Sequence, residues 1–191
     1  MTATTYFAYV FIVCYFVIER LLREGQQALN LKPGEVDAGS SKLLWLSGIT
    51  NLLLFVVAPV LNTHQLGYWK NSNIGWLGLM LMASGLMLRY WAAKTLGRYY
   101  TRTLQISEGQ QIVSRPPYNI IRHPGYLGTL LIVVGAGLAV TNWAVLLVGT
   151  AIGMMSRIYR ISTEERLMRD EFDEEYQTYS DCTWKLIPFL Y

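Results

Sequence analysis

Charged residues are scarce in this chain. They account for 15% of its 191 residues, against roughly 25% in typical soluble domains. Apolar residues reach 52%, and the charges are segregated, so that long uncharged runs remain between them. This composition argues against a soluble domain and indicates an integral membrane protein that contacts the lipid bilayer.

The residues that build metal sites and disulfides are also few. Of the two cysteines, Cys14 lies in an apolar run and Cys182 near the C-terminus, without metal-ligand spacing between them. There are only two histidines, and the net charge of +3 is too small and scattered to suggest nucleic-acid binding. The first apolar run lacks the basic leader and small-residue cleavage site of a signal peptide. We therefore expect unpaired cysteines, no metal and no nucleic-acid partner.

What the chain does contain is a series of apolar runs. A membrane-spanning helix needs about 20 mainly apolar residues, and we predict about five spans, the last two forming a short helical hairpin around Thr141 and Asn142. Beyond Arg157 the chain is dense in charge and typical of an amphipathic helix. The prediction is an all-α integral membrane protein, with residues 1–191 in one membrane-embedded domain. The predicted spans are 6–22, 43–61, 74–96, 126–140 and 143–157.

Basic residues predict the orientation of these spans. The third loop and the C-terminal segment carry most of them, whereas the opposite face has only Lys70. Cytoplasmic loops are enriched in Lys and Arg, so we expect the N-terminus outside and the C-terminus in the cytoplasm. The third loop and the C-terminal helix then meet in one cytosolic pocket. Arg89, inside the third span, is either a functional residue or one that snorkels to the interface, and both interpretations stay open.

The candidate chemistry lies in the stretch 114–128 and on the C-terminal helix. Arg160 and Glu164 are four residues apart, which by itself predicts only a helix ion pair of about 0.2–0.5 kcal/mol. The adjacent Glu164 and Glu165 point about 100° apart on a helix and do not readily share a metal ion. No Ser-His-acid arrangement or activated cysteine is evident. What remains is a site for a charged cofactor, with an arginine that holds an anionic substrate.

These residues resemble the isoprenylcysteine carboxyl methyltransferases, which are integral membrane enzymes related to phospholipid methyltransferases. The resemblance covers about residues 97–189, which we take as the cofactor-binding part. Its central block is Arg122-His123-Pro124-Gly125-Tyr126-Leu127-Gly128, followed downstream by Glu164-Glu165. The other matching residues are Gly97, Tyr100, Ile112, Val113, Tyr118, Phe172, Glu175, Tyr176, Tyr179 and Ile187-Pro188-Phe189. Eukaryotic members have further N-terminal spans, so the chain is similar to a minimal, prokaryotic-type member.

The resemblance implies S-adenosyl-L-methionine as methyl donor, S-adenosyl-L-homocysteine as product and no metal. The acceptor it implies is the C-terminal carboxylate of a prenylated cysteine, on a protein or a small analogue. Arg160 falls where the family binds the substrate carboxylate, and we take it as the catalytic and substrate-binding residue. The implied cofactor-binding residues are Gln105, Gln110, Gln111, Ile112, Val113, Tyr118, His123, Pro124, Gly125, Tyr126 and Glu164.

Carboxyl methylation suits these residues, because a carboxylate is already ionised at neutral pH and needs no general base. The main alternative is a phospholipid or other small-lipid N-methyltransferase, whose amine acceptor must lose a proton. His123 is the only nearby base for that reaction, and the family assigns it to the cofactor. We further expect that Gly128, Gly135 and Gly137 in the helical hairpin leave room for a lipid tail that enters sideways from the bilayer.

Overall fold

The computed structural model describes residues 2–22, 37–70, 72–101 and 109–189. Five α-helices lie in these ranges, with a short 3-10 helix, η2 (Gly97–Tyr99), after the third of them. The same ranges contain no β-strand, only two isolated bridges. The α-helices are α1 (Ala3–Leu21), α3 (Ser40–Thr63), α4 (Ser72–Leu96), α5 (Pro124–Ala139) and α6 (Trp143–Asp181).

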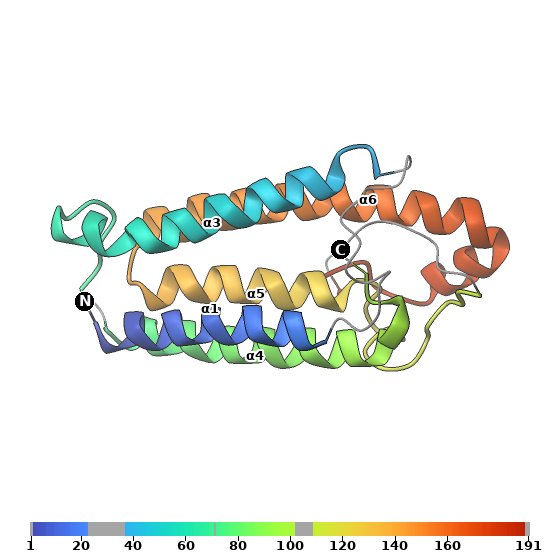
Figure 1. Ribbon diagram of the computed structural model, residues 1–191, viewed down its shortest axis with the longest axis horizontal. Helices are drawn as coiled ribbons and strands as arrows, with labels where there is room; N and C mark the ends of the chain where they lie inside the picture. Colours follow the sequence, from blue (N-terminus) through green and yellow to red (C-terminus); the bar gives the residue numbers. More distant parts are fainter. Residues whose placement is uncertain (1, 23–36, 71, 102–108, 190–191) are drawn as a thin grey trace.

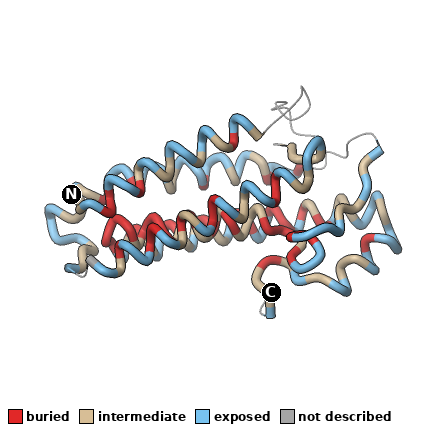
Figure 2. Tube along the Cα trace, turned by 90° about the horizontal axis from the view of Figure 1, so that it is seen from below, coloured by how far each residue is buried: buried red, intermediate tan, exposed pale blue. Residues whose placement is uncertain are grey.

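The helices run side by side along the long axis of the molecule (Figure 1). α4 packs mainly on α5, α3 packs on α6, and α1 packs on α4. Figure 2 shows buried residues along the inner helices, while much of the outer surface is exposed. Many of the exposed side chains are large and apolar, such as Val13 on α1, Leu46 and Val56 on α3, and Met87 on α4. Such a surface fits contact with lipid rather than with water.

Three of the described helices are long and apolar enough to cross a membrane, namely α1, α3 and α6. They coincide with the predicted spans 6–22, 43–61 and 143–157, and they confirm the all-helical, membrane-embedded class. α5 is apolar but only 16 residues long, and α4, although it has 25 residues, is not among the helices apolar enough to cross a membrane. The total of five spans and the membrane topology of the α5–α6 pair stay predictions.

Glycines set the close approach of α4 and α5. A Cβ on Gly78 would lie 2.5 Å from the carbonyl oxygen of Gly135, and one on Gly128 would lie 2.7 Å from that of Gly85. Small residues at such contacts let helices pack tightly in lipid. Gly128 and Gly135 contact α4, so for these two residues the expectation that the hairpin glycines leave room for a lipid tail is wrong. Gly137 packs closely on α6, where an added Cβ would lie 2.5 Å from Cα of Leu146, but it also lines an apolar cavity.

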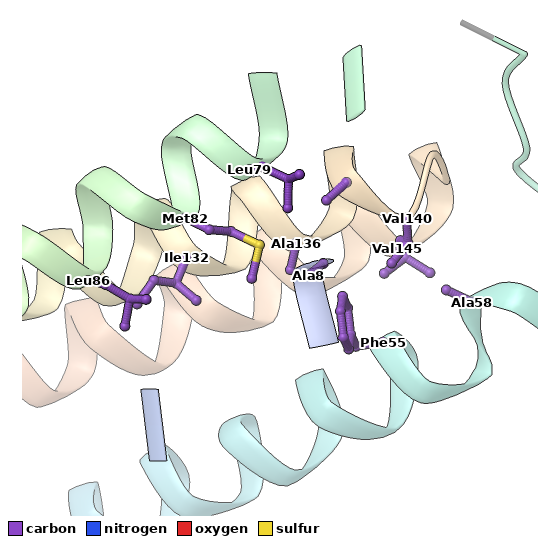
Figure 3. Packing of buried hydrophobic residues seen from close by; sticks show 11 residues of the cluster. Ala8, Phe55, Ala58, Leu79, Met82, Leu86, Ile132, Ala136, Val140 and Val145 are labelled. Carbon is purple, nitrogen blue, oxygen red and sulfur yellow. The ribbon is translucent and has the colours of Figure 1, made fainter. Parts of the chain in front are cut away.

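The apolar core lies between the helices, toward the end where α5 turns into α6 (Figure 3). Met82 from α4, Ile132 and Ala136 from α5, and Phe55 from α3 are each at most 7% exposed. Asn142 closes this end, because its Nδ2 donates to Oδ1 of Asn62 over 2.7 Å and its Oδ1 accepts from the backbone N–H of Val145 over 3.0 Å. The opposite end of the bundle carries the charged cluster.

α6 extends well past the predicted end of its span. We expected a span to about residue 157 and a separate amphipathic helix, but the helix continues past residue 157 without a break. It kinks at Asp173, where φ is 39°, and a last helical segment ends at Asp181. Beyond it the tail returns to the bundle, where the backbone N–H of Trp184 donates to the carbonyl of Ile120 over 2.9 Å. The charged half of α6 and the tail thereby cover the stretch 114–128.

Candidate functional site

His123 is held in place by the C-terminal tail and the start of α5. The backbone N–H groups of Arg122 and His123 donate to the carbonyls of Trp184 and Lys185, over 2.8 and 3.2 Å. Pro124 then occupies the first turn of α5, where its missing N–H costs nothing. With the backbone held in this way, the side chains of Arg122 and His123 both reach Glu165 on α6.

Glu165 is the centre of a buried ion cluster. Its carboxylate lies 3.0 Å from Nε of Arg122, 3.3 Å from Nε2 of His123 and 3.3 Å from Nζ of Lys185, while only 2% of the residue is exposed. Burial alone would raise the pKa of Glu165, but the hydrogen bonds and charges of His123 and Arg122 outweigh it and lower the pKa to about 2. This cluster connects the loop before α5, helix α6 and the C-terminal tail, so its role is structural.

Glu164 faces a different set of groups from its neighbour. Its Oε2 accepts a hydrogen bond of 2.8 Å from the hydroxyl of Tyr126, and that hydroxyl accepts one of 3.2 Å from Nε of Arg160. The ring of Tyr126 also stacks on His123, with centroids 5.7 Å apart. The structure therefore brings together four residues that the sequence predicted for one site, from α5 and from two successive turns of α6.

Arg160 has a partner that the sequence did not predict. Its Nη1 donates to Oδ1 of Asp37 over 2.8 Å, and also to the hydroxyls of Ser40 and Ser41 over 2.8 and 2.9 Å. Asp37 also accepts from the backbone N–H of Ser41 over 3.1 Å, at the start of α3. The only sequence signal was an acidic residue just before an apolar helix, where it favours the N-terminus.

The other predicted cofactor residues that the structure describes lie in the loop before α5 and in its first turn. Tyr118 is buried, its hydroxyl donates to the carbonyl of Ala92 over 3.4 Å, and its own carbonyl accepts from Tyr179 over 2.8 Å. Nε2 of Gln110 lies 3.9 Å from the sulfur of Met168, one turn beyond Glu164 on α6. Gln111 is exposed and Ile112 and Val113 are half-buried in the preceding loop, and Gly125 is half-buried in the first turn of α5. Gln105 lies outside the described residues.

An apolar cavity of about 440 Å³ has Tyr126 in its wall. Its walls come from α1, α3, α5 and α6 and from Arg89 on α4, with Phe16, Trp45 and Val133 among the lining residues. Gly48 also lines it, and a Cβ added there would meet no atom within 4 Å. Tyr126 therefore lines the cavity and has both Arg160 and Glu164 at its hydroxyl end.

Arg89 forms part of the cavity wall and does not snorkel. Its Nε pairs with Oε1 of Glu19 at 2.5 Å, and its Nη1 donates to Thr129 and to the carbonyl of Gly125 over 2.6 and 2.8 Å. It thus links α1, α4 and α5 directly beneath the first turn of α5.

Among the described residues no group of histidine, cysteine or acidic side chains could hold a metal ion.

Comparison with known proteins agrees with this geometry. Residues 76–170 match the isoprenylcysteine carboxyl methyltransferase (ICMT) family. The chain is similar to the probable protein-S-isoprenylcysteine O-methyltransferase of Oryza sativa subsp. indica, with 29% identity over 125 residues that cover 64% of each protein. It is also similar to protein-S-isoprenylcysteine O-methyltransferase A of Arabidopsis thaliana, with 28% identity over 144 residues, 74% of this chain and 68% of the relative.

The fold is similar to a solved structure of the eukaryotic intramembrane Ras methyltransferase ICMT. The TM-score is 0.62 at 22% identity, and the match covers 76% of this chain and 52% of that protein. The chain thus spans about two thirds of the rice relative and about half of the protein with the solved structure. The motif residues, the matched region and the helical architecture all agree with the isoprenylcysteine carboxyl methyltransferase family, which this chain resembles in sequence and fold.

Proposed function

We propose that this protein transfers the methyl group of S-adenosylmethionine to the C-terminal carboxylate of a prenylated cysteine at the membrane. The observation that carries the proposal is the position of Tyr126. Its ring lines the apolar cavity, and its hydroxyl contacts both Arg160 and Glu164. A lipid-tailed carboxylate and a charged cofactor would meet at such a boundary.

The donor set near Tyr126 fits S-adenosylmethionine. Glu164 is half-buried, and Tyr126 is its only hydrogen-bond partner in the described part of the chain, so its carboxylate can bind further hydroxyl or ammonium groups. Gln110 offers an amide, and the stacked rings of His123 and Tyr126 offer an aromatic surface. We assign the cofactor to these residues, together with Tyr118, Gly125 and the loop residues Gln111 to Val113. Gln105 and Pro124 complete the assignment.

The reaction requires alignment more than acid–base chemistry. When bound, S-adenosylmethionine supplies an electrophilic methyl group, whose S–CH3 bond breaks as the O–CH3 bond of the ester forms. Arg160 orients the acceptor carboxylate and lowers the cost of removing it from water. The cavity takes the prenyl tail and excludes water from the reacting end. No residue has to accept a proton, because the acceptor is ionised at neutral pH.

The N-methyltransferase alternative has weaker support. It would need a base beside the methyl group, and Nε2 of His123 already lies 3.3 Å from Glu165 inside the buried ion cluster.

We also propose the predicted orientation, with the charged half of α6, the tail and the site on the cytoplasmic side. The clustering of Arg122, Arg160 and Lys185 at one end of the bundle supports it.

The test is an acceptor comparison. Purified protein in lipid nanodiscs receives S-adenosylmethionine with a labelled methyl group and either N-acetyl-S-farnesylcysteine or phosphatidylethanolamine. We expect label only in the farnesylcysteine product, released by mild alkali because it is an ester. Alkali-stable label in the phospholipid would establish the N-methyltransferase instead. Absence of labelled product with both acceptors, in protein that binds neither of them, would refute both enzyme functions.

A further inference from the structure

Arg157 is a buried cation that the proposed function does not use. It lies on α6 one turn before Arg160, it lines the apolar cavity, and it is 8% exposed. Its Nη1 donates to the carbonyl of Gly153 over 2.8 Å, within its own helix. Its Nε is buried and has no hydrogen-bond partner among the described residues. A charged group so placed is costly unless something pairs with it.

The other buried arginines of the bundle each have a carboxylate. Arg89 pairs with Glu19, Arg122 with Glu165, and Arg160 with Asp37, all within 3.0 Å. In the described ranges no carboxylate lies within 4.0 Å of Arg157. Arg157 is thus the cavity-lining cation whose counter-ion the described chain does not provide. An anion that enters the cavity would supply it.

Arg160 by itself is poorly suited to be the whole receptor for such an anion. Its Nη1 already contacts Asp37 and two hydroxyls, and its Nε contacts Tyr126. An acceptor carboxylate would have to share this guanidinium with the carboxylate of Asp37. Arg157 lies three residues earlier on the same helix, and it reaches the cavity wall that Tyr126 also lines.

We propose that Arg157 binds the carboxylate of the acceptor, on the cavity side of Tyr126, and shares it with Arg160. This inference rests on the proposed function and names a second residue for its acceptor site. Arginine suits the position because it stays ionised when buried and binds carboxylates through two N–H groups. Methylation converts the carboxylate into a neutral ester, which has no charge for Arg157 to hold. The same contact therefore favours binding of the acid and release of the ester to the bilayer.

The test measures the preference for an anion rather than activity alone. Affinities for N-acetyl-S-farnesylcysteine and for its carboxamide are measured in nanodiscs with wild-type protein, Arg157→Gln and Arg157→Met. We expect the wild type to bind the acid about tenfold or more tightly than the carboxamide. In both variants the ratio should fall toward one, because the acid binds more weakly and the carboxamide is unchanged. Arg166→Gln, an exposed position on α6, is the matched control and should keep the wild-type ratio.

Carboxamide binding shows that each variant is folded. Arg157→Met removes the buried charge altogether, so it preserves a folded protein even where a glutamine is not tolerated. A wild-type acid preference in either folded variant overturns the role of Arg157 while leaving carboxyl methylation intact. A wild-type protein that methylates no farnesylcysteine overturns the proposed function and this inference with it. The two failures are therefore distinguishable.

Discussion

Arg160 and Asp37 form a buried ion pair across 2.8 Å, and their side chains are 4% and 3% exposed. The hydrogen bonds from Ser41 and Ser40 and the charge of Arg160 lower the pKa of Asp37, although burial alone would raise it. The guanidinium that we assign to the acceptor is thus already held by the beginning of α3. A resident carboxylate keeps Arg160 in one orientation before the substrate arrives.

Removal of Asp37 should destabilise the protein. Breaking one side of a buried ion pair costs about 3–5 kcal/mol, because the remaining charge has no partner. We expect Asp37→Ala to lower the midpoint of thermal unfolding in detergent. Asp170→Ala, at an exposed position on α6, is the control. Equal midpoints for the two variants would mean that the ion pair contributes nothing to stability.

Replacement of Arg160 should slow turnover sharply. Loss of the group that orients the carboxylate misplaces the reacting oxygen, and a small misplacement can lower the rate about 100-fold. We expect Arg160→Ala to show that loss in the farnesylcysteine assay, whereas Arg166→Ala keeps the wild-type rate. Normal turnover in Arg160→Ala would remove this residue from the site.

Substitutions of the adjacent Glu164 and Glu165 should have different effects. Glu164→Gln should weaken binding of S-adenosylhomocysteine, measured by calorimetry, because Glu164 contacts Tyr126 at the proposed cofactor site. Glu165→Gln should mainly lower the unfolding midpoint, because Arg122 and Lys185 lose their carboxylate. Similar losses of cofactor affinity in both variants would contradict this division.

Stability should fall at acidic pH through Glu165. Its pKa is lowered in the folded state from 4.5 to about 2, so its ion pairs contribute fully above pH 4.5. Below that value the unfolded state takes up the proton first, and the contribution is lost as the pH falls toward 2. Unfolding midpoints of Glu165→Gln should depend less on pH across this window than those of the wild type. Glu171→Gln, at an exposed position, should retain the wild-type dependence.

A single methyl group added at the glycine contacts between α4 and α5 should destabilise the protein. A Cβ at Gly85 would collide with the carbonyl oxygen of Gly128, so the helices must move apart. We expect Gly85→Ala to cost about 1–3 kcal/mol, as overpacked cores do. Gly48→Ala, on α3 with open space around it, should be neutral or stabilising. The comparison of their unfolding midpoints checks whether the tight approach matters.

Local patterns predicted the membrane class and the residues that converge on Tyr126. Composition was enough for the first, because long uncharged apolar runs of this length are typical of helices that cross a bilayer. The i, i+4 spacing of Arg160 and Glu164 placed both on neighbouring turns of one helix, and the family motif supplied Tyr126. The predicted end of the last span at residue 157 was wrong as the end of the helix. Arg, Glu, Leu and Met are good helix formers, so the change in composition ends the apolar part and not the helix.

Pairings between distant segments could not be predicted in the same way. Asp37 and Arg160 are 123 residues apart, and Glu19 and Arg89 are 70 apart, so only the packing of whole helices brings them together. Gly128 and Gly135 were misinterpreted for a related reason. A small residue indicates either open space or close contact, and only the neighbouring helix α4 decides which.

α6 carries Arg157, Arg160 and Glu164 on one uninterrupted rod that begins between the membrane-facing helices and ends among charges. The distance between the group proposed to hold the acceptor and the group proposed to hold the donor is therefore a helical rise of about 10 Å, not a loop conformation. Motion of the surrounding loops leaves that distance unchanged. A single residue inserted between 157 and 164 would instead rotate Glu164 by about 100° around the helix axis relative to Arg157. The acceptor-binding and donor-binding groups would then no longer face the same site.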